Sequence, residues 1–449
     1  MLDFIFHDAD TLLPGGTRRR ASVGVANGQI VAISSGSLNL PAKRIIEGGD
    51  RLLVPGAIDP HVHYGYHDDD VLTETRSAAL GGVTTMLRYH RKTNNYEDLG
   101  QDIADVNARG YCNVGIHLTL MVESQAASLD AYVEHFGVSS FKMLTGYRGY
   151  ASLNIVESDD AFILSVLRKI AAIPGAMACI HCENTDICEA ATAERKALGD
   201  GDLSVWNASR PAFAEGEAVA RMGYLARIAG CPLYIVHITC REALDSLKLL
   251  RRNGQDVRGE TCMHYLTLDE QAPLIAKVAP PLRTSADIDA LWEAVADGTL
   301  DTIGTDHSPR RRAEKMKPTM WDTTVGNVGV GTLVPLLLDE GCHKRGIPLA
   351  QLYARVSENP AKIFHLPTKG RIEIGADADL VLLDLDARRT VTPATQGSMS
   401  DYSLYEGREL RGWPAAVMVM GTLVVEEGAI VCDPGVGRYI SRPPIDRRG

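Results

Sequence analysis

The chain has 449 residues and a formal net charge of −11, and 45% of its residues are hydrophobic and 23% are charged. These values are typical of a globular protein with room for one large domain and a smaller one. The negative charge argues against a nucleic-acid-binding protein, because it implies no broad basic surface. We also expect no membrane partner, since the sequence contains no run of about 18 apolar residues.

Two features of the sequence predict a cytoplasmic protein. The nine cysteines are odd in number and follow no paired framework, which suits a reducing compartment. The first residues, MLDFIFHDADTLL, lack a basic region followed by a long apolar core, so we expect no signal peptide.

Short segments of alternating apolar and polar residues occupy both ends of the chain. Near the N-terminus, Asn27-Gly28 separates two strand-like runs, and such a pair strongly favours a hairpin turn. The same texture returns at residues 377–386 and 415–431. We therefore predict that the termini form one small β-sandwich domain, made of residues 1–53 and 368–449.

The middle of the chain alternates strand-like and helix-like segments, which predicts a parallel sheet with crossover helices. Amphipathic stretches that end on glycine, as helices do, occupy 71–82, 159–175, 216–230 and 240–254. Eight candidate strands lie at 52–63, 84–90, 113–121, 139–144, 176–183, 232–239, 257–266 and 302–307. Eight β/α units in series predict an α/β fold, a (β/α)8 TIM barrel, formed by residues 54–367.

Functional residues of a TIM barrel sit at the C-terminal ends of its strands. At the end of the first candidate strand, His61 and His63 occupy alternate positions, so their imidazoles point to the same side. The ends of later strands carry Lys142, His181, His237 and Asp306. Four histidines and an aspartate predict a shell for one or two zinc-like ions. A cationic lysine beside such ions would be repelled, so it must lie elsewhere or lose its charge.

These residues lie in motifs that resemble the amidohydrolase superfamily, and within it the hydantoinase, dihydropyrimidinase and allantoinase branch. The resemblance covers nearly the whole chain. Its motifs are GAIDPHVH at 56–63, RSAALGGVTTM at 76–86, SFKMLTGY at 140–147, IHCEN at 180–184, VHIT at 236–239, GETCMHYL at 259–266, APPLR at 279–283, TDHSP at 305–309 and GADADLVLLD at 375–384.

The resemblance implies a binuclear metal centre. In that family a lysine is carboxylated by carbon dioxide, and the anionic carbamate bridges two metals, so the resemblance implies this modification for Lys142. The implied ligands are His61, His63 and Asp306 for the more buried ion, and His181 and His237 for the more exposed one. Zinc is the favoured metal, with manganese or iron as alternatives.

The resemblance also implies the reaction, which is hydrolysis of an amide in a ring such as a hydantoin, dihydropyrimidine, allantoin or a related imide or ureide. A hydroxide between two ions would attack the carbonyl carbon. Asp306 would take its proton and pass it to the leaving nitrogen. Tyr147, five residues after Lys142, would donate a hydrogen bond to the oxyanion. The expected partners are a small-molecule substrate and further copies of the chain, in a tetramer or dimer.

Three positions bear on the substrate. Dihydroorotases carry an arginine two residues after the second histidine of HxH, and Gly65 stands there in this chain, which argues against that activity. Hydantoinases usually have a serine, used largely through its main chain, where this chain has Ala279. We assign Ala279 and Asn327 to the substrate-binding residues.

An excess of cations lies near the expected pocket, where Arg88 stands at a position that is acidic or apolar in relatives. Arginine can grip a carboxylate through two parallel hydrogen bonds. We therefore hypothesise that the substrate carries an anionic or strongly polar group held by Arg310, with Arg148 or Arg91 assisting. The alternative is that residues 310–312, all arginine, form a solvated loop.

Other interpretations stay open on the sequence alone. Lysines are usually solvated, and Tyr147 could simply pack against the barrel rim. Glu260 and His264 could orient a metal ligand or serve the structure only. The same centre could hydrolyse a linear amide or carbamoyl compound, and a mononuclear deaminase is disfavoured by Lys142. The family also includes scaffold proteins without the ligands, against which the retention of all six ligands argues.

Overall fold

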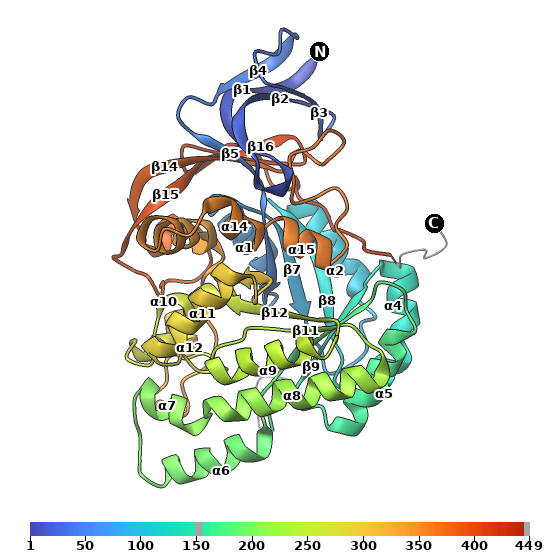
Figure 1. The fold of residues 1–449 in the computed structure, drawn as a ribbon, viewed down its shortest axis with the longest axis vertical. Helices are drawn as coiled ribbons and strands as arrows, with labels where there is room; N and C mark the ends of the chain where they lie inside the picture. Colours follow the sequence, from blue (N-terminus) through green and yellow to red (C-terminus); the bar gives the residue numbers. More distant parts are fainter. Residues whose placement is uncertain (149–154, 444–449) are drawn as a thin grey trace. The chain divides into compact units, whose positions relative to one another are not determined.

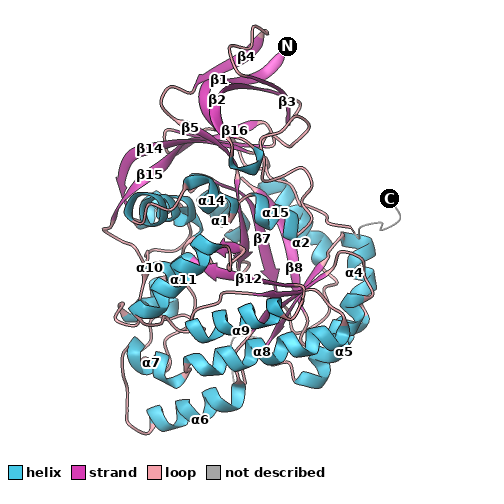
Figure 2. Cartoon of the chain, viewed as in Figure 1, coloured by secondary structure: helices cyan, strands magenta, loops and turns pink. Residues whose placement is uncertain are grey.

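The computed structural model describes residues 1–148 and 155–443, and its strands form two sheets (Figures 1 and 2). The chain divides into two compact units. Unit 1 consists of Met1–Leu87, Gln101–Val114 and Val328–Ile440, and unit 2 consists of Arg88–Gly100, Gly115–Asn327 and the chain from Ser441. None of the helices in the described residues is long and apolar enough to cross a membrane.

The first sheet joins the two ends of the chain. Among the described residues it has nine strands, in the order β17-β16-β15-β14-β5-β1-β2-β3, with β4 paired to β1. In Figure 1 the blue strands β1–β5 belong to the same sheet as the orange and red strands β14–β16. The strands are β1 (Leu2–Leu12), β2 (Arg18–Ala26), β3 (Gln29–Ser34), β4 (Ala42–Glu47), β5 (Leu52–Pro55), β14 (Leu380–Thr390), β15 (Glu409–Val419), β16 (Thr422–Glu426) and β17 (Ala429–Ile430). The prediction that both termini build one β-rich structure is confirmed.

Local sequence explains this sheet. Asn27 and Gly28 connect β2 to β3 with φ values of 51° and 78°, the left-handed conformation that a two-residue hairpin turn requires. One face of the sheet buries an apolar cluster that draws on both termini, including Phe6 and Val23 from the N-terminal strands and Leu382 from β14. The apolar face therefore holds the first and last strands together.

The second sheet has eight strands within the described residues, and its order, β6 to β13, follows the chain. They are β6 (Ala57–Val62), β7 (Val83–His90), β8 (Asn113–Thr119), β9 (Ser140–Leu144), β10 (Met177–His181), β11 (Leu233–Ile235), β12 (Val257–Cys262) and β13 (Thr302–Gly304). The pairs from β8 to β13 are parallel. The sheet is a nearly closed parallel barrel, which confirms the predicted fold class.

The helices agree with the predicted amphipathic stretches, and α8 and α9 lie side by side in unit 2 (Figure 1). Helix α5 begins after Asp159, whose side chain accepts a hydrogen bond from the Phe162 N–H, and α8 ends at Gly230 with φ 68°. The α-helices are α1 (Asp70–Leu80), α2 (Leu99–Arg109), α3 (Glu123–Ala127), α4 (Leu129–Phe136), α5 (Asp160–Ala171), α6 (Thr185–Lys196), α7 (Leu203–Ser209), α8 (Ala212–Ala229), α9 (Arg241–Arg252), α10 (Met263–Thr267), α11 (Ser285–Asp297), α12 (Arg312–Lys315), α13 (Leu333–Leu336), α14 (Leu349–Ala354), α15 (Glu358–Ile363) and α16 (Pro393–Gln396).

Two candidate strands differ from the prediction. The run at 52–63 is not one strand, because β5 pairs with β1 and β14 while β6 begins the barrel. The break falls at Gly56, where an added Cβ would lie 2.0 Å from the Thr84 Oγ1, so the backbone passes too close to that side chain for another residue. The run at 257–266 ends as a strand at Cys262, after which α10 begins.

A substitution at Gly48 tests how tightly the first sheet is packed. A Cβ at Gly48 would lie 2.4 Å from the Ala9 Cα, and the Gly48 N–H donates to the His7 carbonyl at 2.8 Å. We expect Gly48→Ala to lower the free energy of unfolding by about 1–3 kcal/mol, because β1 must shift. Urea unfolding measures the loss. Gly36→Ala is the control, since an added Cβ there meets no atom within 4 Å, and equal stability of the two variants would contradict this packing.

Candidate metal centre

In unit 1, β6 supplies the first pair of candidate ligands. His61 is completely buried in β6 and His63 follows the strand, half-buried. Their Nε2 atoms lie 3.3 Å apart. The Asp59 carboxylate accepts the His61 backbone N–H at 3.1 Å, which fixes the end of the strand. The two imidazoles therefore converge, as expected for alternate positions of a strand.

In unit 2, four strands of the barrel position the remaining candidates. Lys142 lies in β9 and His181 is the last residue of β10. His237 and Asp306 each follow a strand by two residues, after β11 and β13 respectively. His181, His237 and Asp306 thus lie at or just after strand ends, where barrel enzymes carry their functional groups, whereas Lys142 is the middle residue of β9.

His181 and His237 form the second histidine pair. The Nδ1 of His181 lies 2.8 Å from the Nε2 of His237, and both side chains are buried. Burial lowers the pKa of His181 to about 4, although its hydrogen bond to the Glu183 carboxylate favours the charged form. His181 is therefore neutral near pH 7, and a neutral imidazole is the form that binds a metal.

Two of these candidates have a strained backbone. His237 has φ 39° and Asp306 has φ 49°, values in the left-handed region that residues other than glycine rarely adopt. The Glu260 carboxylate accepts the His237 N–H at 3.0 Å, and the Asn327 amide donates to the Asp306 carbonyl at 3.1 Å. The strain is thus held by buried side chains and stands where function was predicted.

Lys142 is buried, with its Nζ 4.3 Å from the centre of the Tyr89 ring. Tyr89 in turn stacks on His117, with ring centres 4.3 Å apart. Burial lowers the pKa of Lys142, and the charges of Asp306 and Glu260 oppose this shift only in part. Lys142 is therefore not the solvated surface lysine of the alternative interpretation.

Tyr147 is buried beside the second histidine pair. Its ring centre lies 4.5 Å from that of His181, and its hydroxyl donates to the Ala279 carbonyl at 3.5 Å. Tyr147 thus lies beside the main chain of Ala279. A role of Ala279 in substrate binding through its backbone stays a prediction. Asn327 is also buried, and its side chain donates to the backbone at Thr305 and Asp306.

The predicted cations have different surroundings. Arg88 is buried, whereas Arg91 and Arg310 are half-buried. Arg148 is half-exposed and forms ion pairs with three carboxylates, those of Glu157, Asp186 and Glu189. Its charge is therefore engaged by protein groups, and a role in substrate binding stays a prediction for all of these arginines.

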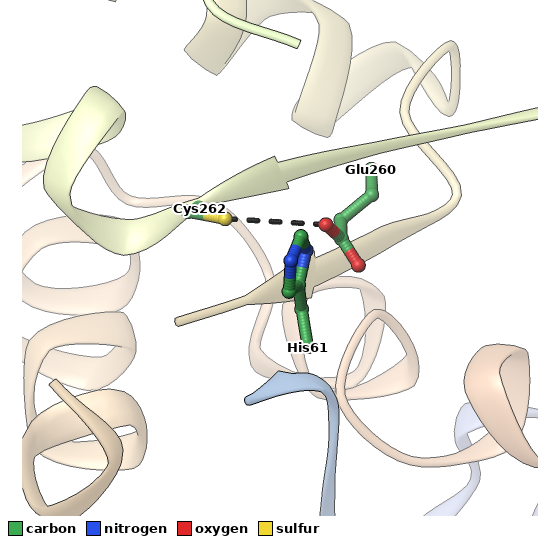
Figure 3. Close-up of side chains that lie close together, drawn as sticks. All are labelled: His61, Glu260 and Cys262. Carbon is green, nitrogen blue, oxygen red and sulfur yellow. Dashed lines mark hydrogen bonds between the residues drawn. The ribbon is translucent and has the colours of Figure 1, made fainter. Parts of the chain in front are cut away.

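From the sequence, Glu183 and Arg210 had no assigned role, and the role of Glu260 was open. All three side chains are buried. Glu183, two residues after His181, binds the His181 ring, and Arg210 binds Glu183. Glu260 accepts from Tyr234 at 2.8 Å as well as from His237, and burial raises its pKa to about 7. Figure 3 draws Glu260 with His61 and Cys262, and marks the 4.0 Å contact from the Cys262 Sγ to the Glu260 Oε1. Only the HxE spacing of His181 and Glu183, which places both on one side of a strand, could have indicated such a pair.

The donor groups fit a divalent metal ion. Each unit brings two imidazole nitrogens together, and histidine and carboxylate side chains are the ligands that zinc prefers. These groups are largely buried. Their loss of hydration costs free energy unless a metal ion or a hydrogen-bond partner compensates for it.

A profile of the amidohydrolase family matches residues 52–424. The chain belongs to the amidohydrolase family. This amidohydrolase is 33% identical to an allantoinase from Rubrobacter xylanophilus over 455 aligned residues, which cover 98% of each chain. It is 30% identical to an L-hydantoinase from Paenarthrobacter aurescens, with 94% of each chain covered. Its structure matches that of a dihydropyrimidinase from Brevibacillus agri with a TM-score of 0.91 and 28% identity, over 100% of both chains. The predicted family and its branch are confirmed.

The lowered pKa of His181 predicts a pH dependence of stability in the metal-free protein. The unfolded chain protonates this histidine near pH 6.5 and the folded chain only near pH 4, so the unfolded state holds more protons between these values. The contribution of His181 to stability therefore falls as the pH is lowered through this window, whereas the raised pKa of Glu260 makes a contribution of opposite sign. We expect His181→Gln to remove on the order of 2–3 kcal/mol of that fall, measured by urea unfolding at about pH 7 and pH 4.5.

The exposed His135 provides the control for this measurement. His135→Gln should show the same pH dependence of stability as the wild type. Parallel losses in the wild type and in His181→Gln would contradict the burial of a neutral imidazole at position 181.

Proposed function

We propose that this amidohydrolase is a binuclear metal-dependent hydrolase that opens a cyclic amide, of the hydantoin, dihydropyrimidine or allantoin class. The observation that carries the proposal is the buried Lys142 in the barrel strand next to the one that ends in His181. It stands in a chain that aligns over almost its full length with an allantoinase and an L-hydantoinase. We take the substrate class from the activities of these relatives, and we take the metal-dependent mechanism from the buried lysine.

We propose the following ligands for two divalent ions. His61, His63 and Asp306 would bind one ion, and His181 and His237 the other. When bound, the ions would supply a hydroxide at neutral pH and polarise the amide carbonyl. Zinc is the metal that we propose, because imidazole and carboxylate ligands suit it.

The burial of Lys142 supports its carboxylation. A lowered pKa increases the fraction of neutral amine, and only the neutral amine has the lone pair that adds to carbon dioxide. The new N–C bond would form as one C–O π bond of carbon dioxide breaks, and the amine proton would pass to water, which leaves an anionic carbamate. The anion would remove the repulsion that an ammonium group exerts on cations, and it would offer carboxylate-type oxygens as ligands.

Asp306 and Tyr147 would perform the proton and oxyanion steps. Asp306, at the end of β13, would accept the proton of the attacking water and pass it to the leaving nitrogen, so that the C–N bond breaks to a carboxylate and a neutral nitrogen. Tyr147 would donate its hydroxyl hydrogen to the oxyanion. In the structure the Tyr147 hydroxyl lies 3.5 Å from the Ala279 carbonyl, so the proposed donor stands beside the main chain of a proposed substrate-binding residue.

A substrate screen tests the proposal. Protein prepared with zinc and bicarbonate should open hydantoin, dihydrouracil or allantoin, and Lys142→Ala should lose this activity together with its bound metal. Labelled bicarbonate should produce a carbamate signal in the ¹³C NMR spectrum of the wild type and none in Lys142→Ala. Lys248→Ala, at an exposed position of α9, is the control. Metal-loaded protein inactive on all three rings, or an active Lys142→Ala variant, would overturn the proposal.

Tyr147→Phe separates oxyanion stabilisation from substrate binding. The variant keeps the ring packed near His181 but lacks the hydroxyl. We expect kcat to fall about 10²- to 10³-fold with little change in KM, because the hydrogen bond strengthens as charge develops on the oxygen. Steady-state kinetics on the substrate found above measure both constants. A rise in KM with kcat unchanged would instead assign Tyr147 to substrate binding.

A further inference from the structure

We propose that Arg210 is a positioning residue that couples the metal ligand His181 to Tyr147. This inference rests on the proposed function, because it takes His181 as a metal ligand and Tyr147 as the oxyanion donor. Arg210 follows α7 and is buried, and its guanidinium group reaches both residues through separate partners. The first partner is the Glu183 carboxylate, and the second is the Gly146 carbonyl.

The first branch runs from Arg210 through Glu183 to His181. Arg210 donates to both oxygens of Glu183, from Nε at 2.9 Å and from Nη2 at 2.5 Å. The same carboxylate lies 2.8 Å from the His181 Nε2. A carboxylate at this distance accepts a hydrogen bond, so Nε2 carries the hydrogen and the lone pair is on Nδ1. That lone pair faces the Nε2 of His237, the other residue that we propose as a ligand of the same ion.

The second branch runs from Arg210 to Tyr147. Arg210 Nη2 also donates to the Gly146 carbonyl at 2.8 Å, and Gly146 immediately precedes Tyr147. The guanidinium carbon lies 5.9 Å from the centre of the Tyr147 ring. Gly146 has φ 79°, and a Cβ there would lie 2.7 Å from the Glu183 Cβ, so the backbone just before Tyr147 passes too close to Glu183 for a side chain at this position. Movement of Arg210 would thus displace the oxyanion donor as well as the ligand.

The chemistry of arginine explains why one residue serves both branches. Its planar group carries several N–H donors in a fixed fork, which can bind two carboxylate oxygens and a carbonyl at once. A lysine ammonium keeps the charge but cannot hold all three acceptors in that geometry. The variant Arg210→Lys therefore removes the coupling while leaving a cation beside Glu183.

The chain offers a matched control in Arg283. Arg283 forms an ion pair with Glu215 at 2.9 Å, and both side chains are as buried as those of Arg210 and Glu183. Its other hydrogen bonds go to Thr239, to Asn207 and to the Arg210 carbonyl, and so to neither His181 nor Gly146. Arg283→Lys should therefore destabilise the protein without the specific effects expected of Arg210→Lys.

The experiment compares zinc affinity, kinetics and thermal unfolding in Arg210→Lys, Glu183→Gln and Arg283→Lys. Arg210→Lys and Glu183→Gln should bind zinc about 10- to 100-fold more weakly in competition with a chelator, as loss of a group that orients a ligand does. Arg210→Lys should also lower kcat at saturating zinc more than it raises KM. Glu183→Gln keeps the bond from Arg210 to Gly146, so its kcat at saturating zinc should fall less.

The outcomes separate this inference from the proposed function. A wild type that binds no zinc would overturn both. A wild type that binds zinc with Arg210→Lys and Glu183→Gln unchanged in affinity would overturn only the inference. So would an equal loss of zinc affinity in Arg283→Lys, because the effect would then come from weakened packing. If Arg210→Lys does not fold, Glu183→Gln decides the matter through its zinc affinity.

Discussion

Lys142, His181, Glu183 and Glu260 all lie almost completely out of water, so each must find a partner or change its protonation state. His181 changes its protonation equilibrium, since burial lowers its pKa to about 4. Glu183 has partners: burial alone would raise its pKa, but Arg210 and His181 hold the pKa at about 2. The same physical constraint thus produces a neutral imidazole beside a permanent carboxylate, and this pairing defines which ring nitrogen is available.

Buried ion pairs contribute little net stability, because dehydration of the charges offsets their attraction, so their main effect is on geometry. Two buried lysines have a similar effect on geometry through hydrogen bonds to backbone carbonyls. Lys277 donates to the carbonyls of Met320 and Thr323 at 2.7 Å each, and Lys315 donates to the Lys277 carbonyl at 2.8 Å. These bonds shape the loop that leads to Asn327, whose amide in turn holds the backbone at Asp306. The two buried lysines therefore help to hold the backbone at Asp306, the carboxylate that we propose as the proton acceptor.

Much of the architecture could be predicted from local patterns. The Asn27-Gly28 turn and the order of the β/α units follow from propensity and periodicity, which act within a few residues. The convergence of His61 and His63 follows from the alternation of a single strand. The division of residues 52–63 between two sheets could not be predicted, because an apolar run is compatible with either sheet. Only the contact between Gly56 and Thr84 marks the break.

The amino-acid sequence by itself determined the fold class, the family and the side chains that stand at strand ends, because these depend on residue type and on short spacings. Only the tertiary structure decided which groups surround them. Glu183 meets Arg210, 27 positions further along the chain, and Tyr147 meets the Ala279 carbonyl, 132 positions further along. Such pairs form because the folded barrel brings distant segments together and excludes water. Neither effect can be predicted from a local segment of the chain.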